Sequence, residues 1–231
     1  MLHQFIFASP KPGMSEKDFQ NYWVHKHAVE FAGKIPQIRQ YAVDTRIALE
    51  GDPEPPLFSG CAEIWLDDAN ALLDALQSPE LIHGARADEP NWAAFWQTIT
   101  LNTETYEILA GSPVSRDEKM VKLMVTVKRK PGMGVSDFRL YSLDTHAPKV
   151  LNVPGLKRYH QCHIPEEFYA VCETPLDGVG MLWFEDVGTL QAALQSPEFV
   201  QGVMADTPNF IDPKYIHSMV VEEHWVIGPN Q

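Results

Sequence analysis

Hydrophobic and polar positions follow a fixed succession along the chain, and the succession occurs twice. Residues 122–128 alternate as a strand does, and Lys130-Pro131-Gly132 ends the pattern. Residues 2–8 form the equivalent strand in the first half. A helix is predicted from about Ser15, a favourable N-cap, because the apolar positions after it recur every three to four residues. These positions are Phe19, Tyr22, Trp23 and His27, with Phe138, Tyr141 and His146 in the second half.

Four further elements are predicted in each half. They are strands at 38–47 and 156–163, strands at 61–66 and 179–184, helices at 69–76 and 188–194, and strands at 99–109 and 218–227. A Ser-Pro pair interrupts the second helix in both halves. The order βαββαβ is typical of a ferredoxin-like fold, in which both helices cover one face of an antiparallel sheet.

Matching residues at a constant separation show that the two halves are homologous. Pro131 lies 119 positions after Pro12, and Trp183 lies 118 positions after Trp65, so one deletion separates the registers. We therefore predict a first repeat at 1–111, a linker at 112–119 and a second repeat at 120–231. Each sheet leaves an apolar face that needs cover, and tandem linkage supplies the other repeat at high effective concentration. We expect an α+β chain whose two repeats pack sheet to sheet as one α/β barrel.

Composition and charge exclude some classes of partner. The net charge of −13 leaves no basic surface for phosphates, so we expect no nucleic-acid partner. The chain has no apolar run of the length of a membrane span and no signal-peptide pattern at its N-terminus, so we expect a cytoplasmic protein without a membrane partner. Its three cysteines are not placed symmetrically in the repeats, which favours reduced thiols over disulfides.

Several motifs of the second half form a set. They are Lys128-Arg129-Lys130-Pro131-Gly132-Met133, His146-Ala147-Pro148, Pro154-Gly155-Leu156, Leu182-Trp183-Phe184 and Glu222-Glu223-His224. Together they resemble the EthD family of the dimeric α/β barrel superfamily. The first half resembles it more weakly, because Val29 stands in place of the proline and Thr105-Tyr106 in place of Glu-His. The resemblance implies one of the activities found in this superfamily. These are isomerase, cofactor-free monooxygenase, and dehydratase, cyclase or decarboxylase activity on aromatic and polyketide compounds.

His27 and His146 are the leading catalytic candidates. Each is predicted near the C-terminal end of an apolar helix stripe, where a histidine either caps the helix or faces a cavity. A neutral imidazole with a pKa of about 6.5 accepts a proton from carbon or oxygen without a cofactor. The family resemblance implies a histidine that acts as a base or orients the substrate. Tyr22, Trp23 and Tyr141 are predicted to contact the substrate, or else to be core aromatics.

His224 is the third catalytic candidate. It is predicted on the last strand, next to the first strand of the second repeat. If it faces the barrel interior, His224 and Thr126 bind a substrate carbonyl or hydroxyl; otherwise it is a structural histidine at the sheet edge. Since His-Ala-Pro and Glu-Glu-His occur together only in the second half, we expect His146 and His224 to serve one reaction. His27 would then support the other pocket or the fold.

A metal or cofactor site is not predicted. His160 and Cys162 share one face of a predicted strand and His163 lies on the other, so the strand offers at most two ligands to one ion. Gly178-Val179-Gly180 opens a strand rather than a helix, so it fails the condition for a dinucleotide fingerprint. We expect activity without added metal, flavin or nicotinamide.

The function predicted first is that of a cofactor-independent lyase or isomerase, of the dehydratase, cyclase or decarboxylase type. Its substrate would be a small aromatic or polyketide-like compound, with histidine as general acid and base. The alternatives are a cofactor-free monooxygenase of a phenolic substrate and a non-catalytic small-molecule binding or auxiliary protein. The sequence leaves open which repeat holds the pocket and which oligomer forms, with a homodimer among the arrangements considered.

Overall fold

A computed structural model describes residues 1–116 and 118–228 of the chain. The predicted linker at 112–119 and the end of the predicted second repeat therefore include residues outside the described part. Contacts divide the chain into two compact units, neither of which is one uninterrupted half of the sequence. Unit 1 comprises Met1–Asn102, Val114–Glu118 and the segment from Val221, whereas unit 2 comprises Thr103–Pro113 and Lys119–Val220.

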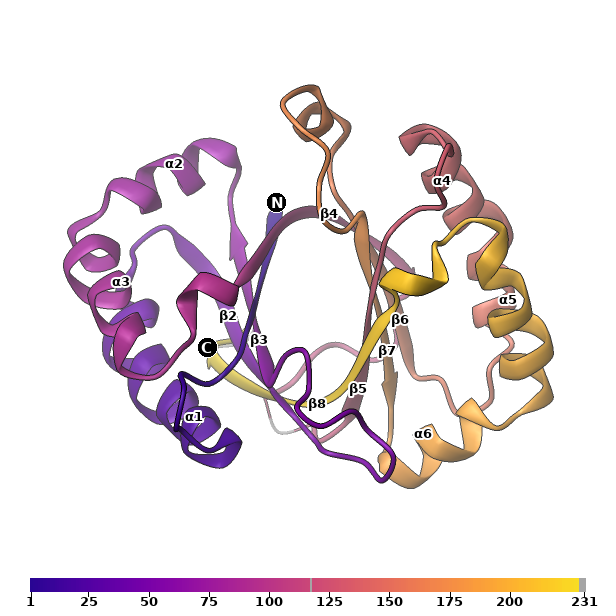
Figure 1. The fold of residues 1–231 in the computed structure, drawn as a ribbon, viewed down its shortest axis with the longest axis horizontal. Helices are drawn as coiled ribbons and strands as arrows, with labels where there is room; N and C mark the ends of the chain where they lie inside the picture. The colour runs from indigo at the N-terminus through magenta and orange to yellow at the C-terminus, as the bar shows by residue number, and fades with distance from the viewer. Residues whose placement is uncertain (117, 229–231) are drawn as a thin grey trace. The chain divides into compact units, whose positions relative to one another are not determined.

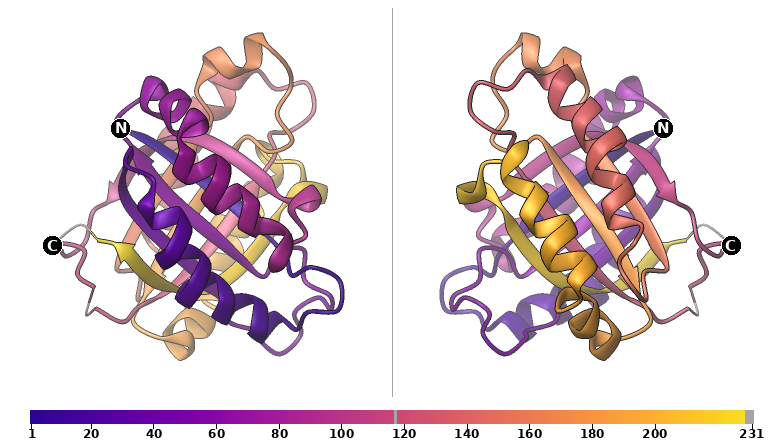
Figure 2. Two further views of the ribbon diagram at one scale, coloured as in Figure 1. Left: turned by 90° about the vertical axis from the view of Figure 1, so that its left-hand side faces the viewer. Right: turned by 90° about the vertical axis from the view of Figure 1, so that its right-hand side faces the viewer.

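Unit 1 contains the βαββα part of the first repeat. Its elements are β1 (Leu2–Ala8), α1 (Glu16–Tyr22), β2 (Ile38–Arg46), β3 (Gly60–Leu66), α2 (Ala69–Gln77) and α3 (Arg86–Asp88). Strands β1 and β2 both pair antiparallel with β3. The helices of this unit lie on one side of its strands (Figure 1, and Figure 2, left).

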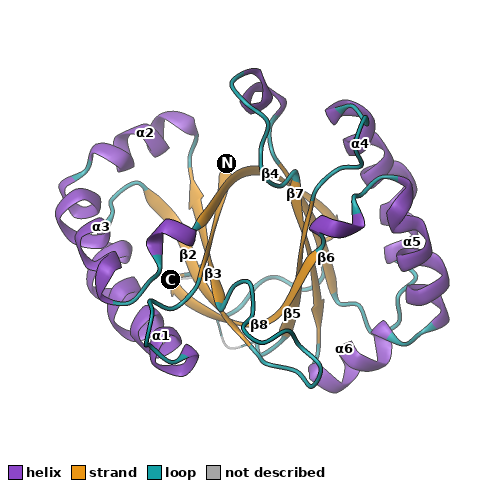
Figure 3. Cartoon of the chain, in the orientation of Figure 1, coloured by secondary structure: helices purple, strands orange, loops and turns teal. Residues whose placement is uncertain are grey.

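Unit 2 repeats this arrangement. Its elements are β5 (Val121–Val127), α4 (Val135–Tyr141), α5 (Ala147–Val150), β6 (Arg158–His163), β7 (Gly178–Phe184) and α6 (Val187–Leu194). Strands β5 and β6 pair antiparallel with β7. Its helices, purple in Figure 3, lie along one side of its orange strands.

The last strand of each repeat is divided between the units. Strands β4 (Ile99–Leu109) and β8 (His217–Ile227) are each 11 residues long, and their two ends belong to different units. The end of β4 pairs with β6, and the end of β8 pairs with β2. The strand order β1-β3-β2-β8-β5-β7-β6-β4 is closed, which confirms the predicted α+β barrel of two βαββαβ repeats.

Local signals explain where the elements begin. Ser15 caps α1, since its Oγ accepts a hydrogen bond from the backbone N–H of Asp18 at 3.1 Å. Asp186 caps α6 in the same way through the N–H of Thr189 at 2.7 Å. Gly13 and Gly132 both have φ of +84°, which explains why the turn after the first strand uses Pro-Gly in both repeats.

The helices extend further than the sequence pattern predicts. After α1 the helical backbone continues in a wider, π-helical form through Trp23–Phe31, and after α4 it continues to Val150. His27 and His146 therefore lie inside helical segments and do not cap helix ends. The helices also resume after Ser-Pro, at Glu80–Ala85 and Glu198–Met204, because proline is tolerated where a helix begins. Among the described residues, no helix combines the length and apolar character needed to cross a bilayer.

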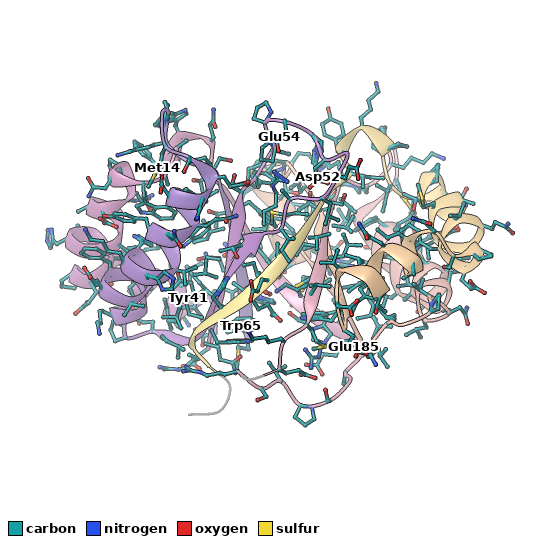
Figure 4. All side chains as sticks on the ribbon, turned by 90° about the horizontal axis from the view of Figure 1, so that it is seen from below. Met14, Tyr41, Asp52, Glu54, Trp65 and Glu185 are labelled. Carbon is teal, nitrogen blue, oxygen red and sulfur yellow. The ribbon has the colours of Figure 1, made fainter. Side chains whose placement is uncertain are left out.

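A buried arginine holds the long loop that follows β2. The Arg46 guanidinium hydrogen bonds to Glu16 at 2.9 Å, to Asp52 at 2.8 Å and to Glu54 at 3.1 Å. Asp52 and Glu54 come together on this loop (Figure 4). The guanidinium thus ties the loop to the start of α1 and fixes one end of unit 1.

The division of β4 and β8 between the units predicts that the second repeat does not stand alone. A fragment of residues 120–231 lacks the part of β4 that pairs with β6, so it exposes a strand edge that favours self-association. We expect this fragment to form oligomers or aggregates in size-exclusion chromatography. Co-expression with residues 1–119 should restore a defined species, and a fragment that stays a stable monomer would contradict the expectation.

Candidate functional site

Each unit contains a cavity between its sheet and its helices, and the two differ in size. The cavity of unit 2 has a volume of about 480 Å³, whereas that of unit 1 has about 200 Å³. Residues of β5, β6 and β7 form the floor of the larger cavity, and the segment Glu198–Met204 contributes Phe199 and Val203 to its helical wall. Its volume and mostly apolar lining are typical of a small-molecule site.

Two substitutions between the repeats explain the difference in volume. Trp23 is buried in unit 1, where its ring lies edge-on to Phe19 at 5.3 Å and tilted against Trp92 at 4.9 Å between ring centroids. The equivalent of Trp23 in unit 2 is Ser142, and the equivalent of Trp92 is Phe210. Smaller side chains at these two positions leave space in unit 2 that indole rings fill in unit 1.

A histidine that is hydrogen-bonded to a buried aspartate forms part of the wall of the larger cavity. Nδ1 of His146 lies 2.9 Å from Oδ2 of Asp206, and His146 itself lines the cavity. The other oxygen of Asp206 accepts hydrogen bonds from Tyr141 at 2.8 Å and from Asn209 at 3.1 Å, and it also contacts Lys149. An ionised carboxylate can only accept, so Nδ1 carries the hydrogen and the lone pair of the imidazole is on Nε2. Among the described residues, none donates to this Nε2.

The electrostatic environment keeps both groups in the form that a general base needs. Burial lowers the pKa of His146 below its ordinary value, and the Asp206 carboxylate opposes this only in part. Burial alone would raise the pKa of Asp206, but hydrogen bonds from Lys149, His146 and Tyr141 outweigh it and hold that pKa well below the usual range. Near neutral pH the pair is therefore a neutral imidazole beside a carboxylate.

Unit 1 has a copy of this pair in a tighter setting. Nδ1 of His27 lies 2.9 Å from Oδ2 of Asp88 and 3.2 Å from Nε1 of Trp92. Burial lowers the pKa of His27 as well. The indole of Trp23 lines the small cavity beside His27 and donates to the hydroxyl of Tyr41 at 3.3 Å. Trp23, for which the sequence predicts a substrate contact, thus lines the smaller of the two cavities.

The structure places Tyr22 and Tyr141 behind the carboxylates. Their hydroxyls donate to Asp88 and Asp206, each at 2.8 Å. Among the residues described as lining the two cavities, neither tyrosine is present. Both tyrosine hydroxyls are thus hydrogen-bonded to the carboxylates, whereas the sequence predicts substrate contact for them.

A polar group on the floor of the larger cavity was missed by sequence reasoning. It consists of Ser142, Tyr159, Gln161 and His163, all of which line the cavity. Gln161 connects the other three through hydrogen bonds of 2.6 to 3.0 Å. The sequence could have indicated this group, because three of its four positions carry a different residue type in the first repeat. The equivalent residues of unit 1 are Trp23, Tyr41, Val43 and Thr45.

His224 and Thr126 lie outside the larger cavity. His224 belongs to the end of β8 in unit 1, where it is opposite Val43 and its Nε2 lies 2.8 Å from Oγ1 of Thr45. Thr126 donates to the backbone carbonyl of His217 at 3.3 Å. Neither is among the described residues that line the cavity with His146. The structure therefore does not bring His224 and His146 into one cavity, because the end of β8 continues into the other unit.

Acidic side chains gather on the sheet of unit 1. Asp44, Glu63 and Glu223 are the one group of three potential metal ligands found among the described residues, with oxygens within 4.8 Å of one another. His3 pairs with Glu63 at 2.9 Å, and all three carboxylates take part in further interactions, so we assign them no ion. His160 packs on Trp183, and Cys162 contacts Thr105 at 3.4 Å.

Comparison with known proteins agrees with the duplicated architecture. The family model described as EthD domain matches residues 11–95 and again residues 130–214. The chain belongs to the EthD family. Its two domain copies correspond to the two repeats. A search of curated proteins found no match.

Solved structures show the same fold at low sequence identity. An anthrone oxidase-like protein is 10% identical, with a TM-score of 0.67 over 96% of this chain and 90% of that chain. Monooxygenase-like proteins of Fusobacterium nucleatum and Lactobacillus acidophilus are each 10% identical, with TM-scores of 0.59 and 0.56. Both alignments cover 96% of this chain, and they cover 91% and 93% of the respective neighbours. At this identity the likeness concerns the fold alone.

The difference between the two cavities yields a test of which one binds ligands. Ser142→Trp restores the indole that unit 1 has and fills the larger cavity. We expect this variant to lose binding of the aromatic probe 2-naphthol in isothermal titration calorimetry. The Tm should change little, since one hydrogen bond of about 1 kcal/mol is exchanged for apolar burial. The matched control Trp23→Phe in unit 1 should bind 2-naphthol as the wild type does. Undiminished binding by Ser142→Trp would place the ligand elsewhere.

Proposed function

We propose that the protein is an enzyme that removes a proton from a small aromatic compound bound in the cavity of unit 2, with His146 as the general base. The observation that carries the proposal is that His146, hydrogen-bonded to Asp206, lines a mostly apolar cavity of about 480 Å³. An acidic C–H or O–H of a phenolic or enolic compound is a proton source that a neutral imidazole can use.

The geometry supports a defined role for each member of the pair. Asp206 accepts the Nδ1 hydrogen, which orients the ring and leaves Nε2 as the proton acceptor. When the proton arrives on Nε2, the nearby carboxylate stabilises the imidazolium. Tyr141 and Asn209 hold the carboxylate in place by donating to its other oxygen. The apolar lining excludes water, so the substrate anion is not reprotonated at once by solvent.

For the fate of the anion, we propose reaction with dioxygen. The names of the solved proteins that share the fold, a monooxygenase-like pair and an anthrone oxidase-like protein, support this choice over the lyase or isomerase predicted first. In the proposed sequence, a CH₂ group loses one proton to His146. The carbanion transfers an electron to O₂, and the two radicals combine to a peroxide R₂CH–O–O⁻. This breaks down to R₂C=O and hydroxide, which takes the proton from His146 to give water. The sum is R₂CH₂ + O₂ → R₂C=O + H₂O.

A lyase or isomerase is the second candidate, because the same His146–Asp206 pair can remove a proton without oxygen. In that case the anion expels a leaving group or is reprotonated at another carbon. Oxygen consumption distinguishes the two candidates. A protein that binds the compound but turns over nothing is the third possible outcome.

The proposal predicts that His146 dominates turnover. Using anthrone as the probe in an oxygen electrode, we expect wild-type protein to consume one O₂ per anthrone oxidised. His146→Ala should lower kcat about 10²–10⁴-fold, the usual contribution of a proton-transferring group. Its Tm should fall about as much as that of His27→Ala, because each substitution removes a hydrogen bond to a buried carboxylate. His27→Ala is the matched control in unit 1 and should lower kcat much less. Loss of turnover in His27→Ala with normal turnover in His146→Ala would move the active site to unit 1.

The pH dependence provides a further check. A base must be neutral to act, so kcat/KM should fall as pH decreases through the pKa of His146. Because burial lowers this pKa, the acidic limb should lie below about 6.5. Asp206 raises the pKa of His146, so Asp206→Asn should move the limb to lower pH and reduce the plateau. A limb that moves to higher pH in this variant would contradict the assignment.

A further inference from the structure

One fixed carbonyl determines the hydrogen-bond directions on the floor of the larger cavity. The backbone carbonyl of Ser142 can only accept, and the side-chain amide of Gln161 lies 3.0 Å from it. The group facing this carbonyl must therefore be the NH₂ of Gln161, which leaves Oε1 of Gln161 on the other side. Oε1 accepts from the hydroxyl of Ser142 at 2.8 Å and lies 3.0 Å from Nε2 of His163.

The orientation of Gln161 fixes the tautomer of His163. Since Oε1 is an acceptor, Nε2 of His163 must carry the hydrogen, and the lone pair of the ring is on Nδ1. This Nδ1 is buried, and no described residue hydrogen bonds to it. His163 is 3% exposed and lines the cavity. A buried acceptor without a donor costs free energy, so the site favours a ligand that supplies one.

The same amide leaves a donor unused on Tyr159. The second N–H of Gln161 donates to the hydroxyl oxygen of Tyr159 at 2.6 Å, so this oxygen acts as an acceptor. The hydroxyl hydrogen of Tyr159 has no acceptor among the described residues. Tyr159 also lines the cavity. The floor therefore presents one unused acceptor and one unused donor, both held in place by Gln161.

We propose that Nδ1 of His163 accepts a hydrogen bond from a hydroxyl group of an aromatic ligand, and that the Tyr159 hydroxyl offers a second, separate hydrogen bond on the same cavity floor. A ligand hydroxyl can donate to Nδ1 of His163, whereas an ether oxygen has no hydrogen to donate and leaves Nδ1 unpaired. The ligand class is thus a neutral phenol or alcohol on an apolar ring system. The inference rests on the proposed function for the location of the site and deepens it by naming the group that the substrate carries.

The charge states of both residues suit this role. Burial, with a further contribution from the Arg139 guanidinium, lowers the pKa of His163 to about 4, so the ring stays neutral and its lone pair remains available. Burial raises the pKa of Tyr159, so its hydroxyl keeps the hydrogen. Unit 1 lacks the subsite, because its equivalents of Gln161 and His163 are Val43 and Thr45.

Binding of two matched probes tests the subsite without reference to turnover. The probes are 2-naphthol and 2-methoxynaphthalene, which differ in the hydroxyl hydrogen. Calorimetry at pH 7 should show 2-naphthol binding about tenfold or more tightly to the wild type, since the ether leaves Nδ1 of His163 unpaired. Equal affinities would overturn the proposal, because they would show that the ligand hydroxyl does not donate to Nδ1 of His163.

Two substitutions of His163 distinguish the role of its Nδ1 from that of its Nε2. His163→Asn keeps an oxygen acceptor near the position of Nδ1, so the preference for 2-naphthol should be retained. His163→Gln keeps a donor near the position of Nε2 and removes the acceptor, so the two probes should bind alike. A preference that survives in His163→Gln and disappears in His163→Asn would overturn the assignment.

His146→Ala separates this inference from the proposed function. The variant should keep the wild-type probe preference while it loses turnover. If wild-type protein shows the preference but oxidises or converts no substrate, the proposed reaction fails and the hydroxyl subsite stands.

Discussion

A buried carboxylate that joins two helical segments is the interaction on which each unit depends. Asp88 and Asp206 lie where the helical segments after Ser-Pro end, and each accepts hydrogen bonds from a histidine and a tyrosine of the first helical segment. A carboxylate in such a setting is stable only while its hydrogen bonds persist, so its position is closely defined. The two segments are thereby held at the distance that leaves a cavity between helices and sheet. The same bond that fixes the architecture also gives the histidine the tautomer of a base.

Duplication preserved this interaction and changed what surrounds it. In unit 1, the indole rings of Trp23 and Trp92 occupy the space beside His27, and Val43 is the sequence equivalent of Gln161. In unit 2 a serine and a phenylalanine replace the indoles, and Gln161 takes the place of the valine. In unit 1 large apolar side chains thus fill most of the space between helices and sheet. In unit 2 this space stays open, and polar groups lie on its floor. Dense packing favours stability, whereas an open cavity with unsatisfied polar atoms is the arrangement expected of a binding site.

Sequence reasoning found the catalytic candidates but not their partners. The spacing of Tyr22, Trp23 and His27 placed a histidine on the apolar helix face, and the repeat showed that His146 shares that position. The recurrent Ala-Asp pair at 87–88 and 205–206 was visible as well. Its contact with the histidine was not, because about 60 positions of chain separate the two residues. The sequence suggested His163 only as a possible metal ligand and gave no reason to select Gln161, because the hydrogen-bond directions of both side chains depend on the Ser142 carbonyl.

The sequence by itself determined the duplication, the βαββαβ order and the family, since periodicity and turn residues are local properties that repeat along the chain. Tertiary structure decided how β4 and β8 are divided between the units, and with it that His224 lies against β2, away from the cavity of His146. It also decided that the cavity of unit 2 is larger than that of unit 1. Strand pairing and cavity volume arise from contacts between residues far apart in the chain. The pattern of apolar positions is a local property, so it does not show which distant side chains come into contact.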